Sequence, residues 1–161
     1  MQIPAFPHNE AQRLQTLHAC AILDTPAEER FDRLTRLAQH MFGVPIAVIS
    51  LIDAHRQWFK SRQGLTVSET PRDISFCGHT ILGREILHVA DATQDVRFAD
   101  NPLVTGAPHI RFYAGAPLHA RNGHALGTLC LIDSVPRDLS EADRAALRDL
   151  ADCVEREFFR E

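Results

Sequence analysis

The 161-residue sequence lacks a basic cluster, a long apolar segment and a secretory signal. Its formal net charge is −4 and it has no run of Lys or Arg, which argues against a nucleic-acid or membrane-surface protein. No apolar segment approaches the length of a membrane span, and MQIPAFPHNE has neither the charged region nor the apolar core of a signal peptide. We therefore expect a cytoplasmic protein that binds neither nucleic acid nor membrane.

Cysteine is scarce, and its spacing is not that of a metal site. The four cysteines are Cys20, Cys77, Cys130 and Cys153, and no two of them form a C-x2-C pair. The nine histidines are scattered, and none lies four residues from a second ligand on one face. The sequence therefore predicts no metal site, and free thiols are expected in a reducing cytoplasm.

A glycine-rich phosphate loop and a βαβ alternation are also missing, which argues against a Rossmann or P-loop fold. The length, with 45% apolar and 24% charged residues, fits one domain with a buried core. Residues 1–8 contain two prolines and are expected to be a flexible lead-in. Residues 9–161 are expected to form the single domain.

Residues 110–133 organise the rest of the chain as a predicted β-hairpin. Two apolar runs flank Asn122-Gly123, a pair typical of a type I′ turn because both central residues need a positive φ. A two-residue turn pairs Gly115 with Cys130. A three-residue turn would instead move Cys130 to the opposite face.

The two-residue register sorts the hairpin into two unlike faces, because side chains alternate across a strand. One face is apolar and is predicted to pack on a core: Ile110, Phe112, Ala114, Ala116, Leu118, Leu129 and Leu131. The other is polar enough to line a cavity: Arg111, Tyr113, Gly115, Thr128, Cys130 and Ile132.

Periodicity and end signals predict the remaining elements. Thr25-Pro26-Ala27-Glu28 reads as a capping box with proline at the first helical position. The predicted helices cover 9–22, 26–42, 76–82 and 140–159, and the predicted strands cover 45–53, 57–62 and 86–90. Hairpin-joined strands with helices at both ends of the chain indicate an antiparallel sheet in an α+β domain.

Several strings carry a family likeness in a common order over residues 20–155. They are LDTPAEERFDRLTRLAQHMFGVPIAVISLID, QWFKSRQGL, ETPRDISFCGHTI, VADATQDVRFADNPLV, and IRFYAGAPL with GTLCLID. The sequence resembles a GAF domain, of the bacterial type that precedes diguanylate cyclase or histidine kinase modules. The resemblance implies a PAS-like central antiparallel sheet of five to six strands. The N- and C-terminal helices would lie on one face and a ligand pocket on the other, roofed by 76–82 and 91–108.

The sequence departs from the ligand-specific and catalytic branches of that family. It has no NKFDE-type motif, and Cys77 is followed by Gly78-His79 rather than directly by the histidine of bilin-binding members. The cysteine set of the free methionine sulfoxide reductases is not matched. The resemblance therefore implies a non-enzymatic module with no required cofactor and an unidentified small-molecule ligand. No effector domain follows Glu161, so we expect output through a separate effector protein, unless the sequence is a fragment.

Ten residues are candidates for the ligand pocket: Ser75, Cys77, His79, Asp91, Arg97, Asn101, Arg111, Tyr113, Thr128 and Cys130. Arg111 and Tyr113 share the cavity face and suit an anionic or hydroxylated ligand, although Arg111 could instead anchor the long loop. The Asp and Asn residues of the loop either complete a polar pocket or bond their own backbone in turns.

The thiols allow two interpretations. Cys77 follows Ser75, the predicted cap of a short helix, where amide dipoles can make a thiol reactive, but a buried structural cysteine is the commoner case. Cys130 on the cavity face could approach Cys77 as a redox pair. Because neither spacing nor local charge arranges such a pair, we expect mild peroxide to leave no bridge between them.

The last helix carries an apolar stripe close to the end of the sequence. An apolar stripe with little of its own domain to pack on predicts a homodimer interface. The predicted interface residues are Leu14, Leu17, Leu147, Leu150, Val154 and Phe158.

Three hypotheses for function remain at this point. The first is a sensory module that binds a small molecule, favoured by a well-formed polar pocket. The second is a thiol-based redox sensor or reductase, favoured if the sulfurs of Cys77 and Cys130 lie within disulfide reach. The third is a ligand-free dimerisation or interaction module, favoured by a pocket filled by its own side chains.

Overall fold

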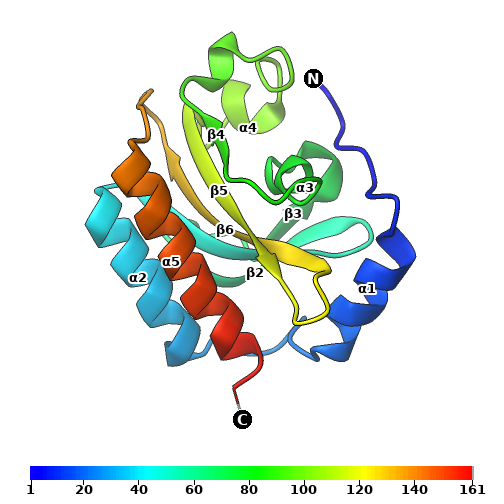
Figure 1. Cartoon of the computed structure of the whole chain (residues 1–161). Coiled ribbons are helices and arrows are strands. Elements are labelled where there is room, and N and C mark those ends of the chain that lie inside the picture. The colour runs from blue at the N-terminus through cyan, green and yellow to red at the C-terminus, as the bar shows by residue number, and fades with distance from the viewer. Residues whose placement is uncertain (161) are drawn as a thin grey trace.

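A six-stranded antiparallel sheet runs through the middle of the protein, with helices on both faces (Figure 1). The structure, a computed structural model, describes residues 1–160. The strand order is β3-β2-β1-β6-β5-β4. The strands are β1 (Ile46–Ile52), β2 (Arg56–Gln63), β3 (Glu69–Pro71), β4 (Leu87–Val89), β5 (Phe112–His119) and β6 (Ala125–Asp133).

Five α-helices accompany this sheet, and α2 and α5 lie side by side against one of its faces (Figure 1). The helices are α1 (Glu10–Ala19), α2 (Glu29–Phe42), α3 (Cys77–Thr80), α4 (Pro102–Thr105) and α5 (Glu141–Phe158). The segment 91–108, expected to be a long loop with one helical turn near Asp95, contains α4 and a single 3₁₀ turn at Ala92–Gln94. The predicted α+β fold with an antiparallel sheet of five to six strands is confirmed, and the sheet has six strands.

The start of α5 shows how local sequence sets an element. The Ser140 hydroxyl accepts the Asp143 N–H at 3.0 Å and the Asp143 carboxylate accepts the Ser140 N–H, which completes a capping box. The buried side of α5 then faces the sheet through Leu147, Ala151 and Val154. These side chains join one apolar core with α2 and the strands.

The predicted hairpin register is confirmed, but the turn that produces it is different. Gly115 pairs with Cys130 as predicted. The Ala120 N–H donates to His124 O (2.9 Å) and only Gly123 in the turn has a positive φ, 88°, so the turn has three residues and is not type I′. A bulge at Leu118/His119 adds one residue to β6 and restores the register that a three-residue turn alone would shift.

The two hairpin faces pack against separate cores, with one exception. Phe112, Ala114 and Leu129 lie in the core under α2 and α5, whereas Tyr113 and Cys130 lie in a second core under α3. Ile110 was placed on the first face and is found in the second core. It precedes β5, so strand alternation does not govern it.

The capping box predicted at Thr25–Glu28, between α1 and α2, is not formed. The helix α2 begins at Glu29, and no side chain caps it. The Thr25 hydroxyl and the Pro26 carbonyl instead accept hydrogen bonds from the buried Lys60 ammonium, which also pairs with Glu28 at 2.7 Å. A buried ammonium needs several acceptors, so tertiary packing on β2 overrides the local signal.

The lead-in, residues 1–8, lies against the domain rather than apart from it. Its Pro4 is buried beside Gly78 of α3, and the Gln2 carbonyl lies 3.1 Å from His79 Nε2. The Arg72 guanidinium stacks over the Phe6 ring at 4.5 Å. These contacts connect the N-terminal segment to the helix that carries Cys77.

The apolar stripe on α5 is core and not an intermolecular surface, which corrects the predicted interface. Leu147 and Val154 are 0% exposed, and Leu17 is 1% exposed within the chain. Phe158 packs on the Phe31 ring of α2 at 5.0 Å. The helix α1 does not accompany α5 but lies by the β5–β6 turn (Figure 1). The remaining two predicted residues, Leu14 and Leu150, are half-buried.

We expect Val154→Glu to unfold the domain rather than to produce a folded monomer. A carboxylate would enter an apolar core without a partner, which should lower the free energy of unfolding by more than about 4 kcal/mol. Urea denaturation followed by circular dichroism measures the change. The matched control is Cys153→Glu, at an exposed position on the same helix, which should cost less than about 1 kcal/mol. A folded, stable Val154→Glu variant would contradict the packing.

Candidate functional site

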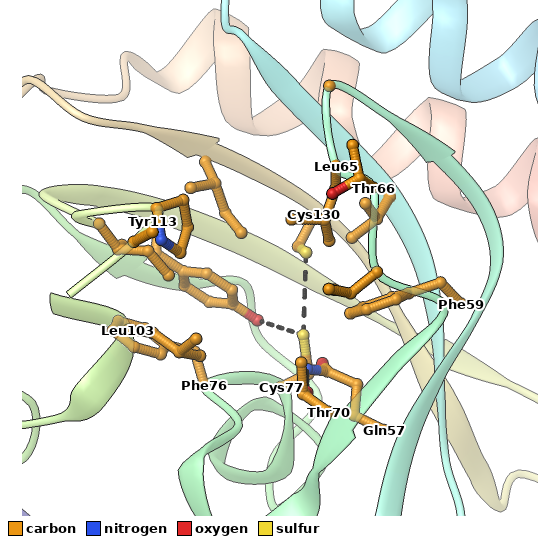
Figure 2. Close-up of a pocket in the computed structure, with 17 residues that line it drawn as sticks. Gln57, Phe59, Leu65, Thr66, Thr70, Phe76, Cys77, Leu103, Tyr113 and Cys130 are labelled. Atoms are coloured by element: carbon orange, nitrogen blue, oxygen red, sulfur yellow. Dashed lines mark hydrogen bonds between the residues drawn. The ribbon is translucent and has the colours of Figure 1, made fainter.

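A cavity of about 350 Å³ lies on the sheet face opposite α2 and α5 (Figure 2). The strands β1, β2, β3, β5 and β6 contribute side chains to it, α3 contributes Cys77 and α4 contributes Leu103. Phe76, just before α3, and the loops after β2 and before β5 complete the wall. Val67 lines the cavity and is 47% exposed, so the cavity reaches the surface there. The lining residues are Val48, Gln57, Phe59, Gly64, Leu65, Thr66, Val67, Thr70, Phe76, Cys77, Leu103, Ala107, Pro108, Ile110, Tyr113, Cys130 and Ile132.

The cavity wall is mostly apolar, and its polar groups are few. Among residues 1–160, no Lys, Arg, His, Asp or Glu side chain lines it. The Gln57 amide donates from Nε2 to Thr70 Oγ1 at 3.0 Å. The Gln57 Oε1 atom is buried and has no hydrogen-bond partner on the protein. Gln57 is a lining residue, so this wall contains an acceptor that the protein leaves without a donor.

Cys77 lies at the centre of a buried cluster of thiols and hydroxyls (Figure 2). The Tyr113 hydroxyl donates to its sulfur at 3.2 Å, and the Thr128 hydroxyl donates at 3.0 Å. The sulfur of Cys130 lies 3.8 Å from that of Cys77. Behind them, the Ser50 hydroxyl lies 2.9 Å from Thr128 Oγ1.

The cluster shifts the pKa values of its two thiols in opposite directions. Burial alone would raise the pKa of Cys77. The side chains of Cys130, Ser50, Thr128 and Tyr113, which can donate to its thiolate, outweigh burial and lower the pKa to about 7. The hydrogen bond with Cys77 and burial raise the pKa of Cys130 well above its usual value. Cys77 is thus the more acidic thiol of the pair, and the better nucleophile at neutral pH.

Tyr113 can reach the cluster because Gly115, two residues later, has no side chain to block it. Side chains at positions 113 and 115 share a face of β5, and the Tyr113 side chain lies across Gly115. A Cβ atom at Gly115 would lie 2.2 Å from the Tyr113 hydroxyl. The hydroxyl then reaches Thr80 Oγ1 of α3 at 2.7 Å, which joins the sheet to α3.

Four of the ten predicted site residues gather here. Cys77, Tyr113 and Cys130 line the cavity, and Thr128 supports the Cys77 sulfur from behind. The expectation that the two thiols are unconnected is wrong, because α3 lies over β6 and brings the sulfurs together.

The other six predicted residues serve the scaffold instead. The Ser75 hydroxyl accepts the Gly78 N–H at 3.1 Å, but the N-cap position of α3 is Phe76 and not the predicted Ser75. Asp91 accepts Thr93 N–H at the 3₁₀ turn. His79 points toward the lead-in rather than into the cavity.

The long loop is held by the remaining three of these residues. Arg97 pairs with Asp95 at 2.7 Å. Asn101 caps α4 and donates to the Ile74 carbonyl at 3.0 Å, and Arg111 donates to the Val104 carbonyl at 2.9 Å. These bonds place Leu103 at the cavity and leave no charge there.

Sequence reasoning missed Gln57 as well as the apolar lining from the loops. Alternation along β2 offered a signal for Gln57, because it shares a face with Phe59 and both line the cavity. Residues 64–67, 107 and 108 lie in loops without periodicity, and only the folded chain brings them to one place.

Residues 1–160 contain neither a metal-binding cluster nor a helix suited to a membrane. No three His, Cys, Asp or Glu side chains gather there as a metal ion would require. No helix in that part of the chain has the length and hydropathy needed to cross a membrane.

The sheet, the helical layer and the cavity under α3 define an α+β domain of the PAS-like kind. The chain belongs to the GAF domain family, whose model matches residues 26–158. A protein of Pseudomonas aeruginosa named as a cyclic di-GMP phosphodiesterase is 46% identical over 155 residues, covering 96% of this chain. The chain spans only 26% of that relative's length.

Solved structures share this fold at low sequence identity. The GAF domain of an Acinetobacter phosphoenolpyruvate-protein phosphotransferase has a TM-score of 0.66 at 20% identity, covering 92% of this chain and 93% of that one. A free methionine-R-sulfoxide reductase of Neisseria meningitidis, solved with its substrate, has a TM-score of 0.67 at 17% identity, covering 99% and 96%. At these identities the likeness concerns the fold alone.

We expect Gly115→Ala to displace Tyr113 and to lower the free energy of unfolding by about 1–3 kcal/mol, because the added methyl group would overlap the ring. Urea denaturation measures the loss. The control is Gly83→Ala, where a Cβ atom meets nothing within 4 Å. In the double variant with Tyr113→Ala, the cost of Gly115→Ala should largely vanish. Fully additive costs would show that the ring does not lie across Gly115.

Proposed function

We propose that this GAF domain is a non-enzymatic sensory module that binds a small, uncharged and largely apolar molecule in the cavity. The observation that carries the proposal is the buried, unpartnered Oε1 atom of Gln57 at the cavity wall. Leaving a buried carbonyl oxygen unpaired costs about 1–3 kcal/mol, which a donor group on a ligand would recover. The cavity volume of about 350 Å³ lies in the range of small-molecule sites.

The lining argues for an uncharged ligand, so of the anionic and hydroxylated ligands first considered it disfavours the anionic one. Arg97, Arg111 and His79 all lie outside the wall, so a phosphate or carboxylate would be buried there without a compensating cation. An apolar body would contact Phe59, Phe76 and the loop side chains. One N–H or O–H group would then be directed at Gln57 Oε1.

The module would transmit occupancy to a signalling effector, either on a separate chain or within a longer protein. The relative from Pseudomonas aeruginosa, whose GAF-like part is a minor share of a protein named as a phosphodiesterase, supports an effector of this general kind. We propose a cytoplasmic homodimer for the module, joined by residues other than the buried stripe of α5. Its thiols would be reduced in that compartment in the absence of an oxidant.

Native mass spectrometry of protein purified from its own cytoplasm tests this function. We expect a co-purifying small molecule that is lost from Gln57→Leu, because leucine fills a similar volume but cannot accept a hydrogen bond. The loss in affinity should be about fivefold to a hundredfold, the value of one buried hydrogen bond. The ligand should be recovered chemically unchanged.

The matched control is Gln12→Leu, the same substitution at an exposed position of α1, which should keep the ligand. Equal occupancy in Gln57→Leu and wild type would remove Gln57 from the binding site. An empty wild-type protein together with conversion of a metabolite on incubation would overturn the non-enzymatic proposal.

A further inference from the structure

Two buried thiols lie next to each other in the cavity wall, and the proposed ligand site does not require them to be close. Cys77 comes from α3 and Cys130 from the middle of β6, with their sulfurs 3.8 Å apart (Figure 2). A disulfide has an S–S distance of about 2.0 Å, so the sulfurs must approach by about 1.8 Å. Because β6 is held between two strands, the single-turn helix α3 is the element that would have to move.

The surroundings of the two sulfurs differ in a way that assigns them different chemical roles. Cys77 accepts hydrogen bonds from Tyr113 and Thr128, and such donors stabilise a thiolate. Cys130 lies deeper in the sheet with 0% exposure and no comparable set of donors. A nucleophile and a resolving thiol therefore stand side by side.

We propose that Cys77 and Cys130 form a peroxide-sensitive pair, which a hydroperoxide entering the cavity converts to a disulfide. The Cys77 thiolate attacks the terminal peroxide oxygen, the O–O bond breaks, and the alkoxide or hydroxide leaves with a proton as alcohol or water. Cys77 is then a sulfenic acid. The Cys130 sulfur attacks it, the S–S bond forms, and the sulfenic oxygen leaves as water with the Cys130 proton.

This step balances, because two thiols and one hydroperoxide give one disulfide, one alcohol or water, and one further water. The sulfurs lose two electrons and the peroxide gains them. The pKa of Cys77, lowered to about 7, supports its role as the attacking thiol at neutral pH. The apolar wall favours an organic hydroperoxide over hydrogen peroxide, since it would accommodate an alkyl group.

The chain contains its own reference thiols. Cys153 is exposed on α5, and Cys20 is half-buried on the other side of the sheet, where its thiol donates to the Thr16 carbonyl. Neither belongs to the cavity wall. If solvent exposure alone decided reactivity, Cys153 would be oxidised first. Faster oxidation of the buried pair would therefore show that its surroundings activate it.

The test treats the reduced full chain with cumene hydroperoxide or hydrogen peroxide, quenches with acid and an alkylating agent, and maps peptides without reduction. We expect a Cys77–Cys130 peptide pair that has lost two hydrogen atoms and is restored by dithiothreitol. It should form about tenfold faster than Cys153 is oxidised, because the hydroxyls of Tyr113 and Thr128 donate to the Cys77 sulfur and favour its thiolate. The Cys20→Ser/Cys153→Ser variant should form it at the wild-type rate.

A second variant separates the two roles. In Cys130→Ser the bridge cannot form, and the sulfenic acid on Cys77 should accumulate and be trapped by dimedone. Recovery of both thiols unoxidised from the wild-type chain while Cys153 reacts would overturn the proposal, and so would irreversible oxidation of Cys77 without a bridge. The assay needs no bound ligand, so its failure is distinct from a failure of the ligand site.

Discussion

The pairing of β5 with β6 is the constraint on which the rest of this structure depends. Because side chains alternate across a strand, this register sends Tyr113 and Cys130 to the cavity and Phe112 and Leu129 to the helical core. A slip of one residue would exchange the two sets. The bulge at Leu118/His119 is therefore as important as the turn, since it cancels the shift that a three-residue turn introduces.

On the cavity side of the sheet most buried polar groups have hydrogen-bond partners and one does not. The paired groups stabilise the fold, and the unpaired one is the candidate for ligand binding. The hydroxyls of Ser50, Thr80 and Thr128 are all paired, as buried polar groups normally are. Gln57 Oε1 is not. The paired hydroxyls hold α3 to the sheet and orient the Cys77 sulfur. The unpaired oxygen of Gln57 favours a ligand that carries a hydrogen-bond donor. The Cys77 cluster and Gln57 both line the same small cavity.

Local sequence signals predicted an element correctly where contacts within the element determine it. They failed where a contact with a distant part of the chain determines it. The Ser140 cap of α5 forms as its sequence indicates. Thr25 also looked like a cap, but the buried Lys60 ammonium takes its hydroxyl. The stripe containing Val154 has the periodicity of either a core or an interface, and only the position of α5 on the sheet shows that it is core. Periodicity reports that a face is buried and not what covers it.

By itself, the sequence determined the α+β class and the two unlike hairpin faces, which follow from patterns that repeat every two or three to four residues and act over short distances. The GAF family likeness rests instead on whole strings of matching residues. The hairpin register was predicted correctly, but from a two-residue turn in place of the three-residue turn and bulge that produce it. Only the tertiary structure decided that Cys77 meets Cys130, that Gln57 faces the cavity, and that the wall carries no charge. Those facts depend on how α3 and the aperiodic loops pack on the sheet, and contacts between distant segments leave no local pattern in the sequence.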